Sequence, residues 1–100
     1  MRQALVLSDK DNVATALADL AASATVEVEV QGNARSVTLR ADVPFGHKFA
    51  LAALAAGEPV VKYGYPIGRT TAPVEPGDHV HVHNVEGLRG RGDLESKRTG

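Results

Sequence analysis

The chain has 100 residues, of which 43% are hydrophobic and 4% aromatic, with no cysteine and a formal net charge of -1. This length allows one domain, and the lack of cysteine excludes a disulfide framework, a thiolate metal site and a cysteine nucleophile. The charge argues against a nucleic-acid-binding protein, and no apolar run approaches the ~20 residues of a membrane span. We expect a cytoplasmic protein whose small side chains leave surface for a partner or a homo-oligomer.

The first quarter of the chain predicts a short strand followed by a helix. Residues 4–7 are apolar and are typical of an edge strand. Asp9 and Asp11 are suitable residues to cap a helix start. Apolar residues then recur at helical spacing, namely Val13, Ala16, Leu17, Leu20 and Ala21. This pattern predicts a helix that begins just after Asp11.

Strands and turns dominate the rest of the chain. Valines alternate with polar residues over 26–30, and the alternation resumes at Val37 and Leu39 after a turn at 31–33, which predicts a hairpin. An Ala- and Leu-rich segment at 48–56 predicts a second short helix.

Two further strands are expected near the end, at residues 58–63 and 79–85, with turns at 64–68 and 73–78. We find no internal repeat. The pattern therefore predicts one mainly β domain at residues 1–86, with one or two short helices. A tail rich in glycine and charge, residues 87–100, is expected to be mobile.

The strand expected at 79–85 carries His79, His81 and His83. Alternate residues of a strand share a face, so all three imidazoles point to one side. Neighbouring histidines would lie ~6.6 Å apart along such a strand, and two imidazoles at that spacing can converge on one ion. We predict His81 and His83 as metal ligands with His79 as a third candidate; the alternative is a solvated face that binds nothing. Asn84 can orient a ligand or cap the strand end.

Two other segments carry polar groups suited to chemistry. In Gly46-His47-Lys48, the imidazole can transfer a proton near neutral pH and the ammonium can hold a carboxylate. Lys62 and Arg69 flank a turn with two tyrosines and can bind an anionic sugar. The alternatives are an exposed loop for the first segment, and for the second a turn whose tyrosines, Tyr63 and Tyr65, fill the core.

Taken in order, these segments resemble the amino-terminal SAF-type domain of the altronate/galactarate dehydratase family. The resemblance covers about residues 3–86. It rests on Asp11-Asn12-Val13-Ala14, Gly46-His47-Lys48, Lys62-Tyr63-Gly64 with Ile67-Gly68, and Val80-His81 with His83-Asn84. It implies a β-clip fold, and a domain either fused to a large catalytic part or made as a separate small subunit.

The resemblance also implies a function. The chain would be the small subunit of a metal-dependent hydro-lyase that removes water from an aldonate or aldarate, inactive without its large catalytic subunit. The metal would be Fe²⁺, or else Mn²⁺, held mainly by the large subunit. His47 and Lys48 would be catalytic, and Lys62, Arg69 and Asn84 would bind the substrate.

Three alternatives stay open. A related small subunit, that of (2R)-sulfolactate sulfo-lyase, serves the elimination of sulfite instead of water. An SAF-like domain can also be a non-catalytic module that binds carbohydrate or stabilises an assembly. Finally, the histidine strand can make the chain a free-standing metal-binding protein.

Overall fold

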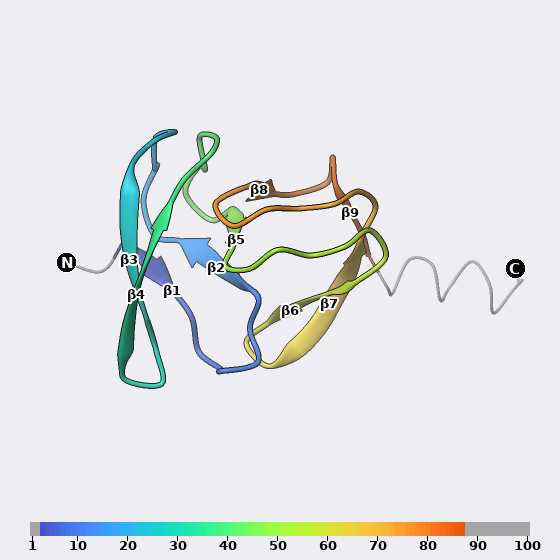
Figure 1. Ribbon diagram of the computed structural model, residues 1–100, viewed down its shortest axis with the longest axis horizontal. Coiled ribbons are helices and arrows are strands. Elements are labelled where there is room, and N and C mark those ends of the chain that lie inside the picture. Colours follow the sequence, from blue (N-terminus) through green and yellow to red (C-terminus); the bar gives the residue numbers. More distant parts are fainter. Residues whose placement is uncertain (1–2, 88–100) are drawn as a thin grey trace, which may run out of the picture.

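The computed structural model describes residues 3–87, which form nine short strands and no helix (Figure 1). The strands are β1 (Ala4–Leu5), β2 (Val13–Ala16), β3 (Thr25–Val30), β4 (Asn33–Thr38), β5 (Lys48–Ala50), β6 (Pro59–Lys62), β7 (Tyr65–Thr70), β8 (His79–Val80) and β9 (Val85–Gly87). The prediction of a mainly β domain is confirmed, and the two predicted helices are wrong. Among these residues, no helix could cross a membrane. The tail predicted at 87–100 lies outside them, apart from Gly87.

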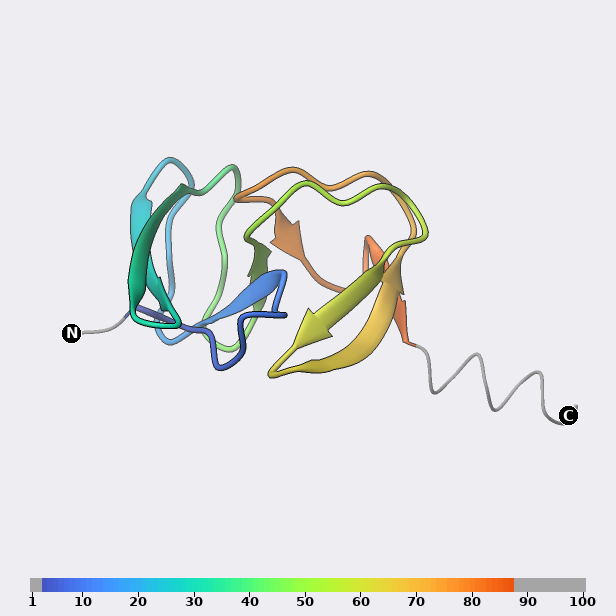
Figure 2. The same cartoon turned by 60° about the horizontal axis from the view of Figure 1, so that its bottom comes forward.

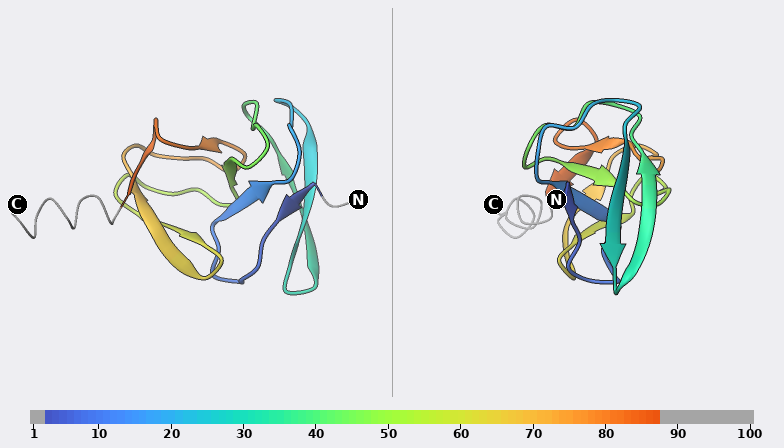
Figure 3. Two further views of the ribbon diagram at one scale, coloured as in Figure 1. Left: turned by 180° about the vertical axis from the view of Figure 1, so that it is seen from behind. Right: turned by 90° about the vertical axis from the view of Figure 1, so that its left-hand side faces the viewer.

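All strand pairs are antiparallel and build three small sheets within the described chain. One sheet has the order β1-β2-β5-β8, a second is the β3–β4 hairpin, and a third has the order β6-β7-β9. The hairpin lies at one end of the molecule and the third sheet at the other, with β2 and β5 between them (Figures 1 and 2). The view from behind shows the same order (Figure 3).

Strands β2 and β5 are buried on both faces because they separate two apolar cores. Ala14 of β2 and Phe49 of β5 belong to the core shared with the hairpin. Val13 and Ala50, their neighbours in the chain, belong to the core shared with β6. Alternate residues thus enter different cores, as the two-residue period of a strand requires.

This double burial explains why the first predicted helix is wrong. All four residues of β2 are buried, so an apolar run that fits a helical stripe fits a central strand equally well. Asp11 does not cap a helix: its carboxylate accepts hydrogen bonds from the backbone N–H groups of Leu7, Ser8 and Gly64. The carboxylate therefore ties the loop before β2 to the turn after β6.

A nine-residue unit occurs four times in the structure, contrary to the prediction of no repeat. Each unit begins with a bend, makes one isolated β-bridge, turns and then enters a strand. The units span residues 17–25, 40–48, 51–59 and 71–79. The bridge residues pair as Leu20 with Val43 and as Leu54 with Val74, and all four are buried. The turns share one positive-φ position, held by Ser23, Gly46, Gly57 and Gly77. The third unit occupies most of the segment predicted as the second helix.

The two hairpins use the same two-residue turn. The predicted hairpin is confirmed as β3–β4, with positive φ at Gln31 and Gly32. In the β6–β7 hairpin the same positions are Tyr63 and Gly64, as the twist of paired strands favours. The turn predicted at 64–68 is therefore wrong, because residues 65–70 continue as β7.

Candidate functional site

The histidine segment is not one strand. β8 ends at Val80 and residues 81–84 turn before β9 begins. Asn84 holds this turn, because its Oδ1 accepts a hydrogen bond from the His81 backbone N–H at 2.9 Å and its Nδ2 donates to the His79 carbonyl at 2.9 Å. The Asn84 backbone N–H also donates to the His81 carbonyl at 3.0 Å. The side chain predicted to orient a ligand or cap a strand therefore positions the histidines.

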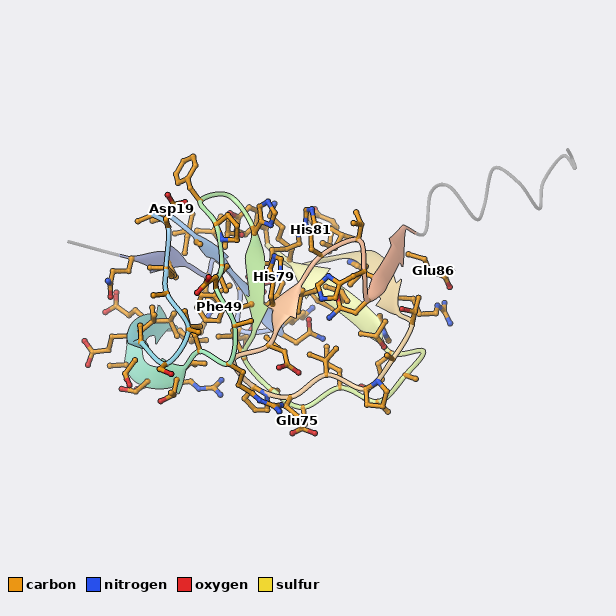
Figure 4. All side chains as sticks on the ribbon, turned by 90° about the horizontal axis from the view of Figure 1, so that it is seen from above. Asp19, Phe49, Glu75, His79, His81 and Glu86 are labelled. Atoms are coloured by element: carbon orange, nitrogen blue, oxygen red, sulfur yellow. The ribbon has the colours of Figure 1, made fainter. Side chains whose placement is uncertain are left out.

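His47 joins two of the other histidines in one cluster. β5 pairs with β8 so that Lys48 faces Val80, which places His47 across from His81. The Nδ1 of His47 lies 2.9 Å from the Nε2 of His79, and the His47 and His81 rings stack with centroids 4.0 Å apart. One ring nitrogen from each of the three lies within 4.8 Å of the others. Figure 4 shows the labelled His79 and His81 near each other.

His83 lies outside this group of three. Its ring contacts that of His79, with centroids 5.2 Å apart, but the side chain is exposed on the turn at residues 81–84. The structure thus gathers His47, His79 and His81, whereas the sequence predicted His81 and His83 as the ligand pair. The partnership of His47 was missed because it depends on the pairing of β5 with β8, for which the sequence carries no local signal.

Burial and neighbouring positive charges lower the pKa of two of these imidazoles. Partial burial lowers the pKa of His79, and the charges of His47, His83, His81 and Lys48 lower it further. Partial burial likewise lowers the pKa of His81, with His47, Lys48 and His83 adding to the effect. A neutral imidazole offers the lone pair that a metal ion needs. The lowered pKa values disfavour protonation, so the cluster is suited to bind a metal ion near neutral pH.

Lys48 lies beside the cluster, and Lys62 lies near Lys48. Burial lowers the pKa of the Lys48 ammonium, and the nearby charge of Lys62 lowers it further. Lys62 also places its Nζ 4.9 Å from the centre of the Tyr63 ring. Two half-buried cations held near each other favour an anion as their counter-charge.

A shallow hollow of about 230 Å³ opens between the sheets, next to this basic group. It is lined by Lys48, Ile67, His81, Val82, Val85 and Gly87. Arg69, predicted to bind substrate, is an exposed residue of β7 and faces Glu86 of β9 in register. Among the described residues, the lining therefore contains Lys48 and His81 but not Arg69 or Lys62.

The two tyrosines of the Lys62 segment differ in their surroundings. Tyr63 is half-buried, and its hydroxyl donates a hydrogen bond to the Thr15 Oγ1 at 3.3 Å. Tyr65 is 74% exposed, so the interpretation that both tyrosines fill the core is wrong for Tyr65.

Comparison with known families identifies the domain. The family model described as the altronate/galactarate dehydratase SAF domain matches residues 2–88. The chain belongs to this family. The resemblance seen in the sequence is thereby confirmed, and so is its implication of an all-β SAF domain.

Several relatives of this SAF domain carry names that describe lyases. Altronate dehydratase of Escherichia coli (strain K12) is 55% identical over 75 residues, which cover 75% of this chain and 14% of that protein. Altronate dehydratase of Bacillus subtilis (strain 168) is 31% identical over 86% of this chain and 16% of that protein. The (2R)-sulfolactate sulfo-lyase subunit alpha of Paracoccus pantotrophus is 49% identical over 53% of this chain and 79% of that protein. This chain thus spans a small part of the altronate dehydratases and most of the sulfo-lyase subunit.

Proposed function

We propose that this SAF domain serves a hydro-lyase that removes water from a sugar acid, together with a larger catalytic part. The 55% identity to a segment of an altronate dehydratase is the observation that carries this proposal. Because that segment is 14% of the relative, most of the reaction machinery would lie outside the residues matched here. The domain would act as a small subunit or as one part of a longer assembly.

The basic side of the site suits the substrate class. Aldonates and aldarates are carboxylates. When the α-proton is removed during elimination, further negative charge develops on the carboxylate oxygens. The Lys48 ammonium lines the hollow beside His81, where it can bind a carboxylate, and Lys62 adds positive charge next to Lys48. Arg69 and Asn84 are assigned less direct roles, Arg69 at the surface of β7 and Asn84 as the residue that positions the histidine turn.

The imidazole side of the site suits a divalent cation, either Fe²⁺ or Mn²⁺. Bound there, such an ion would supply Lewis-acid stabilisation of the negative charge that forms on the substrate. The residues of this chain that fit it are His47, His79 and His81, whose ring nitrogens converge. This assigns His47 to the cluster rather than to proton transfer, so the group that takes the α-proton would belong to the larger part.

A second function is favoured by one specific observation. The match to a protein named (2R)-sulfolactate sulfo-lyase subunit alpha covers 79% of that protein and 53% of this chain, so that relative, unlike the altronate dehydratases, has little sequence beyond the match. In that reaction sulfite leaves in place of water, while the substrate keeps its carboxylate. The Lys48 side of the site suits both substrates equally, and the leaving group would be recognised elsewhere.

Reconstitution distinguishes these functions. The chain is purified together with a large dehydratase-like protein and assayed with aldonates, aldarates and sulfolactate. Formation of a 2-keto acid supports the hydro-lyase, and release of sulfite supports the alternative.

Lys48→Ala should raise KM by about 10-fold or more because a carboxylate contact is lost. The control is Lys10→Ala, which removes an exposed ammonium of the loop before β2 and should leave KM unchanged. A stable complex without either reaction would indicate a non-catalytic binding or assembly module.

A further inference from the structure

We propose that this SAF domain itself binds one divalent transition-metal ion through His47, His79 and His81. The inference rests on the geometry of the cluster; it depends on the proposed function only for which metal is bound in the cell. It differs from the ligand set expected from the sequence, in which His81 and His83 were paired on one strand.

The separation of the ring nitrogens fits a shared ion. Metal–nitrogen bonds to imidazole are ~2.1 Å long, so two ligands of one ion can lie up to ~4.2 Å apart. The Nδ1 of His47 and the Nε2 of His79 are 2.9 Å apart, and all three nitrogens lie within 4.8 Å of one another. Small rotations of the rings would therefore place all three nitrogens around one ion.

The backbone that carries these ligands is held from several sides. The His47 backbone N–H donates to the Pro44 carbonyl at 2.9 Å, and its carbonyl accepts from the Ala16 N–H at 2.8 Å. The side-chain amide of Asn84 makes hydrogen bonds to the backbone groups of both His79 and His81. Ligands held in this way lose little freedom on binding, and groups that orient ligands strengthen a metal site.

The composition of the cluster predicts an open site for an anion. Three imidazoles are the protein ligands of catalytic sites that keep a further position open. Within the described part of the chain the group contains no carboxylate, so the double charge of the ion would stay uncompensated. His81 and Lys48 line the same hollow. A hydroxy-carboxylate can thus bring one oxygen to the ion and its carboxylate to the Lys48 ammonium.

Calorimetric titration of the full chain, made without a histidine tag, tests the ligand set. Ni²⁺, Co²⁺ and, without oxygen, Fe²⁺ are titrated at pH 7.5, and we expect one ion per chain. Loss of one ligand in His47→Ala or His81→Ala should weaken binding by about 100-fold. His83→Ala is the matched control, because it removes an exposed imidazole outside the group, and should change the affinity by less than about 3-fold.

The visible spectrum of the Co²⁺-loaded chain provides a second readout. Added glycolate should change this spectrum, and the change should be absent or much weaker in Lys48→Ala. Thermal melts of every metal-free variant separate lost ligands from lost folding, and His79→Gln replaces His79→Ala if the latter unfolds.

The proposal is overturned if the folded wild-type chain binds no ion more tightly than ~1 mM, or if His83→Ala weakens binding as much as His47→Ala. A spectrum that glycolate leaves unchanged would overturn the open position. Because metal binding is measured without a larger partner, a failed lyase assay with intact metal binding would contradict the proposed function alone.

Discussion

Asn84 shows how one side chain shapes the candidate site. Its amide accepts from the His81 backbone N–H and donates to the His79 carbonyl, so it satisfies two backbone groups at the point where the strand ends. From the sequence, Asn84 was predicted to orient a ligand or to cap the strand. Its observed bonds indicate that it acts on the ligand histidines and only through them on anything bound.

Asn84→Ala should therefore destabilise the domain and weaken metal binding without removing a ligand. Leaving one half-buried donor and one acceptor unpaired costs about 1–3 kcal/mol. Urea unfolding of the metal-free chain measures the loss. Asn84→Asp keeps the acceptor oxygen and loses the donor, so it should fall between the wild type and Asn84→Ala. Equal stability of all three proteins would show that the turn does not depend on this amide.

The lowered pKa values of His79 and His81 predict how the stability of the metal-free domain depends on pH. Both values lie below the ordinary 6.5 because of partial burial and the nearby charges of His47, His83 and Lys48. Below that pH the unfolded chain binds more protons than the folded one, so unfolding becomes easier. Above it these two groups have no effect on stability.

The expected outcome is a lower urea midpoint at pH 5.5 than at pH 7.5, measured with a metal chelator present. His79→Gln should reduce this difference, because it removes one of the two imidazoles whose protonation is disfavoured by folding. His83→Gln, a change at an exposed position, should reduce it less. A midpoint that rises toward pH 5.5 would contradict the assigned direction.

At the scale of elements, strands with one exposed face could be predicted from the alternation of apolar and polar residues. Strands buried on both faces could not. The valines of β3 alternate with glutamates because one face of the hairpin is exposed, and that hairpin was predicted with its turn. β2 shows no alternation because both of its faces are buried. Val13, Ala16 and Leu20 therefore matched a helical stripe, although Leu20 belongs to the turn unit after the strand.

The repeated turn unit was also missed, although its four copies share a pattern in the sequence. All four units have alanine at their second residue, a buried Leu or Val at the fourth and a residue with positive φ at the seventh. Three of the four units have glycine at this seventh residue, while the first has Ser23. The pattern is easily overlooked because alanine and valine are common throughout this chain, so three shared positions in nine do not stand out.

Gly77 is the turn glycine whose replacement should cost most. Its φ is +89°, and an added Cβ would collide with the Thr38 carbonyl oxygen. Gly77→Ala should lower the free energy of unfolding by about 3 kcal/mol or more, since strain and a backbone clash add. Gly32→Ala is the control: φ is +81° but no atom lies within 4 Å of the added Cβ, so we expect a loss of about 1–2 kcal/mol. Denaturant unfolding compares the two, and equal losses would contradict the close approach.

At the scale of the whole molecule, the candidate site lies where two sheets meet. His47 and Lys48 come with β5 of the four-stranded sheet, while Ile67 and Val85 come from β7 and β9 of the third sheet. The residue types for anion and metal binding were readable from the sequence. Their grouping was not, because it depends on strand pairs between segments more than thirty residues apart, such as Lys48 with Val80.

The central claim is that this face of the SAF domain serves a lyase acting on a sugar acid. The most direct measurement is turnover of aldonates and aldarates by the chain in complex with a large dehydratase-like protein, with Fe²⁺ present. We predict formation of a 2-keto acid by the wild type and by His83→Ala, and a loss of at least about 100-fold in His47→Ala. A complex that forms but eliminates water from none of these acids, or in which His47→Ala retains full turnover, would contradict the claim.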